Sequence, residues 1–199
     1  MSNRNSTVEL IDPQFLLNAY SIGYFPMAES REGPISWHSP DPRGIFELER
    51  FNIPRSLEQT IRKNLFEVRV DRAFEETMRA CAARDETWIS ETIIRSYCKL
   101  FELGFAHSVE SWKDGKLAGG LYGVCLGAAF FGESMFSTAA DASKVSLVHL
   151  VERLRSRDFR LLDTQFVTPH LARFGAVEIS REAYLRRLNE ALALTRSFS

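Results

Sequence analysis

One acidic side chain lies inside the most aromatic segment of the chain. Glu133 follows Gly132 in the run FFGESMFS, which spans residues 130–137. An ionised carboxylate is costly to bury, so it either lines a pocket, meets a partner, or faces water from an edge strand. The neighbouring glycine indicates a β-bulge or a ligand that closely approaches the backbone. Glu133 is therefore the first candidate for a catalytic or substrate-binding residue.

A second candidate pair is Asp163 and Gln165, in the segment LLDTQF at residues 161–166. Alternate side chains of an extended strand share a face, so these two are expected to point the same way. A carboxylate beside a carboxamide can orient an amine through hydrogen bonds, although glutamine cannot act as a strong base. A helix-capping aspartate followed by an exposed glutamine is an equally acceptable interpretation.

Nucleic acid is a third possible contact. The net charge is −1, so a polyanion has to be held by a local basic patch. Arg55, Arg62 and Lys63 are spaced to share one face of a helix, which either contacts phosphates or is simply solvated. Trp88 precedes a predicted helix, and it either stacks on a base or packs in the core.

The sequence lacks the patterns of metal, covalent or nucleotide-cofactor chemistry. Its three cysteines and four histidines have no ligand spacing. No GxSxG, P-loop or GxGxxG motif is present. We expect no metal, no cofactor and reduced cysteines. With no signal-peptide pattern and no apolar run of about 20 residues, we also expect a cytoplasmic protein without a membrane span.

Helices and strands must position these groups. Periodicity and capping residues predict helices at 12–22, 53–64, 73–83, 90–103, 142–157, 168–174 and 181–193. Alternation predicts strands at 66–70, 107–112, 117–124, 128–136, 160–165 and 176–179, with Asp114 and Gly115 forming a hairpin turn. Residues 23–43 are rich in Pro, Gly and Ser, and are predicted to form an ordered loop.

This order of elements predicts an α+β fold with a mixed sheet covered by helices. A boundary after the predicted loop divides the chain into a small N-terminal lobe, residues 1–43, and a catalytic domain, residues 44–199. Because no amphipathic helix is left without a role, we expect a monomer.

Several short motifs occur in order along residues 13–190. The most specific are WHSPDPR at 37–43 and FGESMFS at 131–137. Others are GYFP at 23–26, TWI at 87–89, LGFAHSVE at 103–110, GGLYG at 119–123, ASK at 142–144, DTQ at 163–165, HL at 170–171 and FGA at 174–176. Together they resemble the motifs of the leucyl/phenylalanyl-tRNA–protein transferases.

The resemblance implies a small N-terminal lobe joined to a domain like that of the GCN5-related acetyltransferases. It implies an enzyme that moves Leu or Phe, with Met as a further candidate, from aminoacyl-tRNA to proteins that begin with Arg or Lys. A peptide bond forms, and the product is marked for N-degron-dependent degradation. Neither a metal nor a cofactor takes part.

The resemblance also assigns roles to the candidate residues. Asp163 and Gln165 match residues that position the incoming α-amine and help to deprotonate it. Glu133 and Asp163 would supply negative charge toward the acceptor. The apolar pocket for the donor side chain matches Leu121, Phe130, Gly132 and Glu133. The site for the terminal adenine matches Trp88 and Met27. The basic surface that binds tRNA matches Arg55, Arg62 and Lys63.

Two departures from the family pattern affect the adenine site. Met27 stands where some members carry a stacking Trp, and His38 replaces a second Trp. A thioether can pack on a base, but it gives no aromatic stack.

Two rival functions remain at this stage. An N-acetyltransferase of the same fold would need a glycine-rich pyrophosphate turn, which residues 137–144 lack. A non-catalytic tRNA-binding module would gain nothing from acidic groups such as Glu133 and Asp163 near a polyanion.

Overall fold

The computed structural model describes residues 10–199. Helix α1 (Pro13–Ser21) begins as predicted, because the Asp12 carboxylate accepts a hydrogen bond from the Phe15 N–H at 2.9 Å. The following segment corrects our prediction of a loop: β1 (Phe25–Ala28) and β2 (Ile35–His38) form an antiparallel hairpin. Each strand of a two-stranded sheet has a free edge, so Pro26 is tolerated in β1 despite its missing N–H.

The larger sheet has seven strands in the order β4-β5-β6-β7-β8-β3-β9. Every neighbouring pair is antiparallel except β7 and β8, which are parallel. The strands are β3 (Arg43–Phe46), β4 (Glu67–Val70), β5 (Ala106–Lys113), β6 (Lys116–Leu126), β7 (Ala129–Ser137), β8 (Leu161–Gln165) and β9 (Ala176–Ile179). Strand β3 was not predicted, because it is short and directly follows Pro42.

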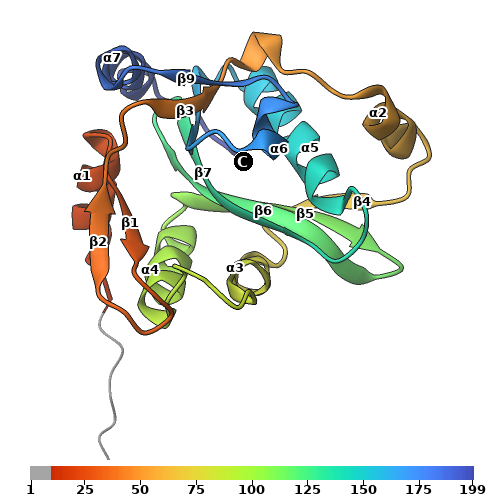
Figure 1. Cartoon of the computed structure of the whole chain (residues 1–199), viewed down its shortest axis with the longest axis horizontal. Helices are drawn as coiled ribbons and strands as arrows, with labels where there is room; N and C mark the ends of the chain where they lie inside the picture. The colour runs from red at the N-terminus through yellow and green to blue at the C-terminus, as the bar shows by residue number, and fades with distance from the viewer. Residues whose placement is uncertain (1–9) are drawn as a thin grey trace, which may run out of the picture.

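Helices cover both faces of this sheet. In Figure 1, α3 (Phe74–Ala82) and α4 (Glu91–Glu102) lie on one face, and α5 (Ala142–Ser156) lies on the other. The remaining helices are α2 (Arg55–Arg62), α6 (Pro169–Ala172), α7 (Arg181–Leu192) and the short 3-10 helix η1 (Leu48–Arg50). All seven predicted helices are confirmed, with ends shifted by a few residues.

Strand alternation divides the core into two clusters. Phe131 and Leu161 pack with the residues of α1, α3 and α4, whereas Phe130 and Leu162 pack with the residues of α5. The predicted α+β fold with a mixed, helix-covered sheet is confirmed. The division into residues 1–43 and 44–199 stays a prediction, and residues 1–9 lie outside the described part of the chain.

The β5–β6 hairpin is also confirmed. Lys113 pairs with Lys116 across Asp114 and Gly115. Both turn residues have positive φ, 51° and 73°, as a two-residue type I′ turn requires. This hairpin sets the register of the central strands, which carry the pocket described below.

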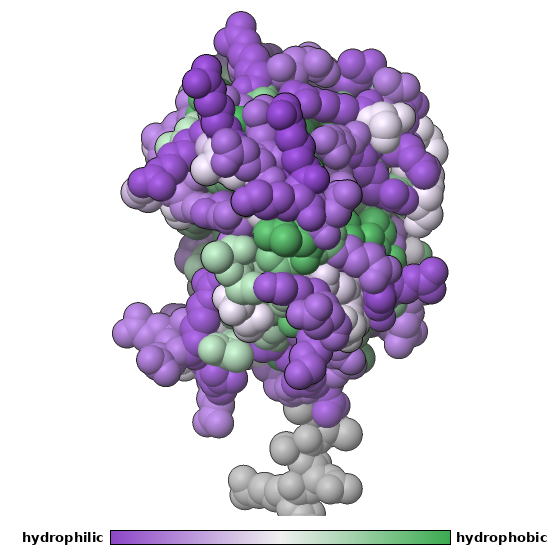
Figure 2. Space-filling view, turned by 90° about the vertical axis from the view of Figure 1, so that its right-hand side faces the viewer, coloured by the Kyte–Doolittle hydropathy of each residue, from purple (hydrophilic) through white to green (hydrophobic). Residues whose placement is uncertain are grey.

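The molecular surface is largely polar on the side where α2 lies. Figure 2 shows this face, on which hydrophobic residues gather only near the middle. Within residues 10–199, no helix has both the length and the apolar character needed to cross a bilayer.

Candidate active site

The parallel strands β7 and β8 stay paired over only part of their length. Residues Ala129–Phe131 pair with Leu161–Asp163, whereas β7 continues to Ser137 without a partner on that side. A pocket of about 120 Å³ opens where the pairing ends. Its lining consists of Phe46, Leu121, Tyr122, Gly132, Glu133, Ser134, Met135, Leu147, Leu150, Leu162, Thr164, Gln165 and Leu171.

A β-bulge directs Glu133 toward this pocket. Gly123 of β6 pairs with Gly132, and Tyr122 pairs with Ser134, so Glu133 is the extra residue on β7. The bulge expected beside Gly132 is therefore present. It removes Glu133 from the regular alternation of its strand, which is why neither face could be assigned to it from the sequence.

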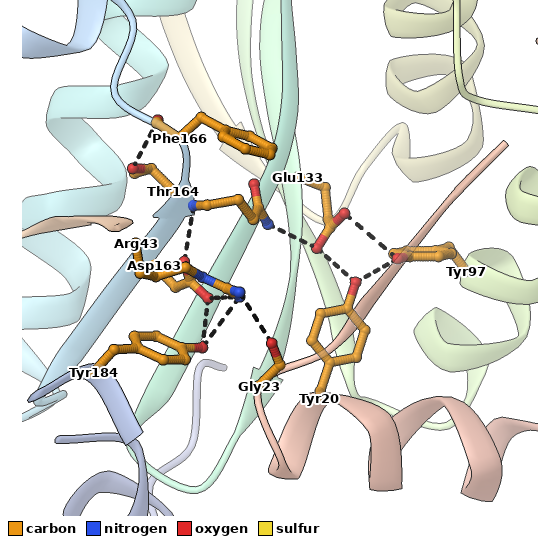
Figure 3. Close-up of polar contacts among 10 residues, drawn as sticks. Tyr20, Gly23, Arg43, Tyr97, Glu133, Asp163, Thr164, Phe166 and Tyr184 are labelled. Atoms are coloured by element: carbon orange, nitrogen blue, oxygen red, sulfur yellow. Dashed lines mark hydrogen bonds and ion pairs between the residues drawn. The ribbon is translucent and has the colours of Figure 1, made fainter. Parts of the chain in front are cut away.

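Side chains, rather than backbone groups, bind the Glu133 carboxylate. Tyr20 donates a hydrogen bond to Glu133 Oε1 at 2.6 Å, and Gln165 Nε2 donates to the same oxygen at 3.3 Å. The Tyr97 hydroxyl lies 3.4 Å from Oε2 and shares a hydrogen bond with the Tyr20 hydroxyl (Figure 3). Burial raises the pKa of Glu133 to about 8, although the hydrogen bond from Tyr20 opposes this shift. The carboxyl can thus exchange a proton near neutral pH.

The Asp163 carboxylate is fully buried and has a different environment. Arg43 approaches it with two nitrogens, Nε to Oδ1 at 3.0 Å and Nη2 to Oδ2 at 2.6 Å. Tyr184 donates to Oδ2 at 2.7 Å, and the Gln165 N–H donates to Oδ1 at 2.8 Å. Asp163 does not line the pocket. It lies within a closed network of donors, beside Arg43 and Tyr184 (Figure 3).

The placement of Gln165 corrects one detail of the sequence analysis. Gln165 has a left-handed backbone, φ 58°, so it departs from the extended alternation of β8. It lines the pocket together with Leu162 and Thr164, rather than sharing a face with Asp163. The two residues are nevertheless joined through the Gln165 N–H.

The pocket contains most of the residues expected to bind a substrate side chain. Leu121, Gly132 and Glu133 line it. Phe130 does not: its side chain is fully buried in the core and stacks on Phe198 at 5.1 Å between ring centroids. Sequence reasoning missed four apolar residues of the pocket wall. They are Phe46 of β3, Leu147 and Leu150 of α5, and Leu171 of α6.

Trp88 and Met27 line a second, wider cleft of about 830 Å³. The cleft lies between the β1–β2 hairpin and the segment that precedes α4, and His38 belongs to it as well. Its rim also carries carboxylates, namely Glu29, Glu32, Asp85 and Glu86. Such a rim disfavours phosphate groups but tolerates an uncharged nucleoside.

The three predicted tRNA-binding cations remain free of ion pairs within residues 10–199. Arg55 and Arg62 are exposed on α2, and Lys63 is exposed at its C-terminal cap. No carboxylate of the described part of the chain forms a salt bridge with them. They are therefore available to phosphates. In the same residues, no group of His, Cys, Asp and Glu is arranged to hold a metal ion.

Four residues of this network were missed by sequence reasoning: Tyr20, Arg43, Tyr97 and Tyr184. They come from α1, β3, α4 and α7, and only the fold brings them together. Arg43 alone carried a signal, because it ends the WHSPDPR block.

Comparisons with known proteins identify the family. The family model described as leucyl/phenylalanyl-tRNA protein transferase matches residues 45–189, and that of its N-terminal domain matches residues 9–41. A leucyl/phenylalanyl-tRNA–protein transferase of Paramagnetospirillum magneticum is 62% identical over 188 residues, covering 92% of this chain and 90% of that protein. One of Gloeobacter violaceus is 55% identical over 188 residues, covering 94% and 97%. The chain therefore belongs to the leucyl/phenylalanyl-tRNA–protein transferase family, and it is an aminoacyltransferase.

Proposed function

We propose that this enzyme transfers Leu or Phe from aminoacyl-tRNA to the N-terminal Arg or Lys of acceptor proteins, and so marks them for N-degron-dependent degradation. The observation that carries this proposal is the pocket between the diverging strands β7 and β8. It combines apolar walls with a carboxyl and a carboxamide, Glu133 and Gln165. The apolar walls suit an apolar side chain of the donor, and the carboxyl and carboxamide suit the amine of the acceptor.

The size of the pocket suits the donor side chain. Its volume of about 120 Å³ is well above the roughly 10–15 Å³ that a single water needs on the same measure. The pocket therefore has room for a branched side chain such as that of leucine. Phenylalanine is larger, but the flexible Met135 thioether in the wall can move aside. An apolar pocket discriminates by only about 1–3 kcal/mol per methylene, so we expect both amino acids to be used, and Met as a poorer donor.

The proposed reaction is aminolysis of an ester. The neutral α-amine of the acceptor attacks the ester carbonyl carbon; a C–N bond forms, and the C–O bond to the ribose breaks. Glu133 accepts the one proton that the amine loses, and the same proton then passes to the departing ribose oxygen, which leaves as a hydroxyl and restores the Glu133 carboxylate. Gln165 orients the amine. Since the ester is already activated, holding the reactants together supplies much of the acceleration, roughly 7–11 kcal/mol.

The donor tRNA would occupy three places. Its aminoacyl side chain enters the pocket beside Leu121 and Gly132, and its terminal adenine packs in the cleft of Trp88 and Met27. Phosphates of the acceptor stem contact the basic face of α2, Arg55, Arg62 and Lys63. Phe130 supports the pocket from the core.

The cationic acceptor would be drawn by Glu133. Asp163 was also expected to supply negative charge, but its charge is matched by Arg43 at 2.6 Å. We therefore assign the negative charge that faces the acceptor to the ionised form of Glu133 and not to Asp163. The proposed monomer is complete for this chemistry, because every residue named comes from one chain.

We also propose that residues 44–199 have the arrangement of a GCN5-related acetyltransferase-like domain, with residues 1–43 as the small lobe. Support comes from the parallel pair β7 and β8, whose pairing ends at the pocket. Acetyl-CoA binding is not expected, since residues 137–144 lack a glycine-rich turn for the pyrophosphate.

The test is a transfer assay. Purified enzyme is mixed with tRNA charged with labelled Leu and with model proteins that begin with Arg, Lys or Gly. Label on the Arg and Lys proteins, but not on the Gly protein, is the expected result. Equal labelling of all three, or none, would refute the proposed acceptor. A parallel titration calorimetry experiment with acetyl-CoA should show no binding.

A further inference from the structure

The ion pair of Arg43 and Asp163 is buried beside the pocket, and neither residue lines it. Both side chains are fully buried. Two aromatic rings enclose the guanidinium: the Tyr184 ring centroid lies 4.4 Å from its carbon, and the Phe25 ring lies 4.9 Å from it. Burial is the largest single influence and opposes the charge of Arg43, but the charge and hydrogen bonds of Asp163, with smaller contributions from Tyr184 and Glu133, together outweigh it and raise the pKa of the guanidinium. Arg43 therefore stays charged.

Asp163 has no free lone pair with which to accept a substrate proton. Its Oδ1 accepts from Arg43 Nε and the Gln165 N–H, and its Oδ2 accepts from Arg43 Nη2 and the Tyr184 hydroxyl. A carboxylate offers about four acceptor sites, and all four are occupied. Asp163 can therefore affect the reaction only through the residues that are hydrogen-bonded to it.

We propose that Arg43 is a positioning residue of the transfer reaction: it fixes Asp163, which in turn fixes the left-handed backbone of Gln165 and aims its carboxamide at Glu133. This inference rests on the proposed function. A non-glycine residue at φ 58° is strained, so an outside hydrogen bond has to hold it. The bond from Gln165 N–H to Asp163 Oδ1, 2.8 Å, supplies this support.

The N-terminal helix supports Arg43 in turn. The Gly23 carbonyl, just after α1, accepts a hydrogen bond from Arg43 Nη1 at 3.0 Å. Gly23 has φ +84°, and a Cβ there would lie 3.1 Å from side-chain atoms of both Tyr184 and Leu185. This close approach requires glycine. The placement of the reacting carboxamide thus depends on contacts from β1, α1 and α7 that never reach the substrate.

Substitutions at Tyr184 and Arg43 distinguish this positioning role from a purely stabilising one. Tyr184→Phe keeps the ring over Arg43 and removes one hydrogen bond to Asp163; we expect kcat to fall about 3–10-fold with both KM values unchanged. Arg43→Gln should lower kcat roughly 100-fold, because small misplacements of a catalytic group have effects of that order. Arg43→Lys should recover part of this loss. Arg187→Gln is the control, since Arg187 also lies on α7 and pairs with Glu47, away from Asp163.

A double-mutant cycle tests the route through Asp163. If Arg43 acts only through Asp163, then Arg43→Gln combined with Asp163→Asn loses no more kcat than the worse single variant. Multiplying losses would overturn the proposal, as would an unchanged kcat in folded Tyr184→Phe. Labelled-amide NMR adds a readout that needs no activity: the Gln165 side-chain signals should shift in Tyr184→Phe but not in Arg187→Gln. Unshifted signals contradict this inference, whereas an inactive wild-type enzyme contradicts only the proposed function.

Discussion

Two glutamates on strands of the same sheet, Glu110 fully buried and Glu133 partly exposed, have opposite surroundings. Glu110 of β5 is fully buried, and it accepts hydrogen bonds from the backbone N–H groups of Arg72 and Ala73, both at 3.1 Å, and from the Ser108 hydroxyl at 2.6 Å. These amides lie just before α3, where a carboxylate also meets the positive end of the helix. Glu110 is a fixed part of the scaffold.

Within residues 10–199, no backbone N–H donates to Glu133, which lies at the wall of a pocket. Burial raises the pKa of both carboxyls; hydrogen bonds from the Ser108 hydroxyl and the Ala73 and Arg72 N–H groups oppose the shift at Glu110, whereas tyrosine hydroxyls oppose it at Glu133. The comparison shows that burial alone does not mark a reactive carboxyl. What distinguishes Glu133 is that side chains hold it at the wall of a pocket, where a substrate amine can reach it.

The largest expected effect is on transfer by Glu133→Gln. Loss of a general base lowers rates by roughly 100- to 10,000-fold, so transfer should fall within that range while tRNA binding persists. Glu110→Gln is the matched control: it should destabilise the fold by about 1–3 kcal/mol, because an optimal acceptor of backbone N–H groups is lost, without changing the rate per folded molecule. Comparable losses of activity in the two variants would remove the distinction between the two glutamates.

A cross-strand glycine pair sharpens the comparison at the pocket. Gly123 pairs with Gly132, but their surroundings differ. A Cβ at Gly132 would meet only the Asp163 carbonyl oxygen, at 3.4 Å, whereas one at Gly123 would lie 2.2 Å from the Phe131 carbonyl oxygen. Gly132→Ala should therefore fold, narrow the pocket and reduce kcat/KM for Phe-tRNA about tenfold more than for Leu-tRNA. Gly123→Ala should fail to fold, as judged by circular dichroism. An unchanged Phe-to-Leu ratio would separate Gly132 from the donor site.

Glu133 should make part of the protein's stability depend on pH. The folded-state pKa of Glu133 is about 8, against an ordinary value of 4.5, so between these values the folded protein binds a proton that the unfolded chain does not. Stability from this group is present below about pH 4.5 and is lost as pH rises through 8, on the order of 1.4 kcal/mol per pKa unit. Glu133→Gln should thus raise the melting temperature relative to wild type more at pH 8.5 than at pH 5. A difference independent of pH would argue against the raised pKa.

The smallest effect concerns tRNA affinity. Arg62→Glu should weaken tRNA binding and reduce the slope of log K against log salt by about one. Arg95→Glu is the control, because Arg95 already pairs with Glu91 on α4. Identical slopes in wild type and Arg62→Glu would make Arg62 an ordinary surface residue.

Local signals predicted most of the elements, and they failed where structure depends on distant partners. Asp114 and Gly115 specify their turn by themselves. The strands in residues 25–46 depend on pairing with each other and with β8 and β9, and their prolines conceal the alternation.

The site shows the same limit. Glu133, Gln165 and Leu121 were identified from residue type and family motifs, and they do line one pocket. The tyrosines that hold Glu133 could not be foreseen, because Tyr20 and Tyr97 are 77 residues apart and carry no local sign of meeting. Phe130 was expected in the pocket, but its ring is buried against Phe198, in the same core cluster as the pocket residues Leu121 and Leu162.

The most direct test of Glu133 as the reacting base is single-turnover transfer by wild type and Glu133→Gln from pH 6.5 to 9. Ionisation of the acceptor amine affects both enzymes equally, so the ratio of their rates isolates Glu133. The ratio should rise about tenfold per pH unit below 8 and level off above it. A ratio that stays constant across this range would contradict the assignment.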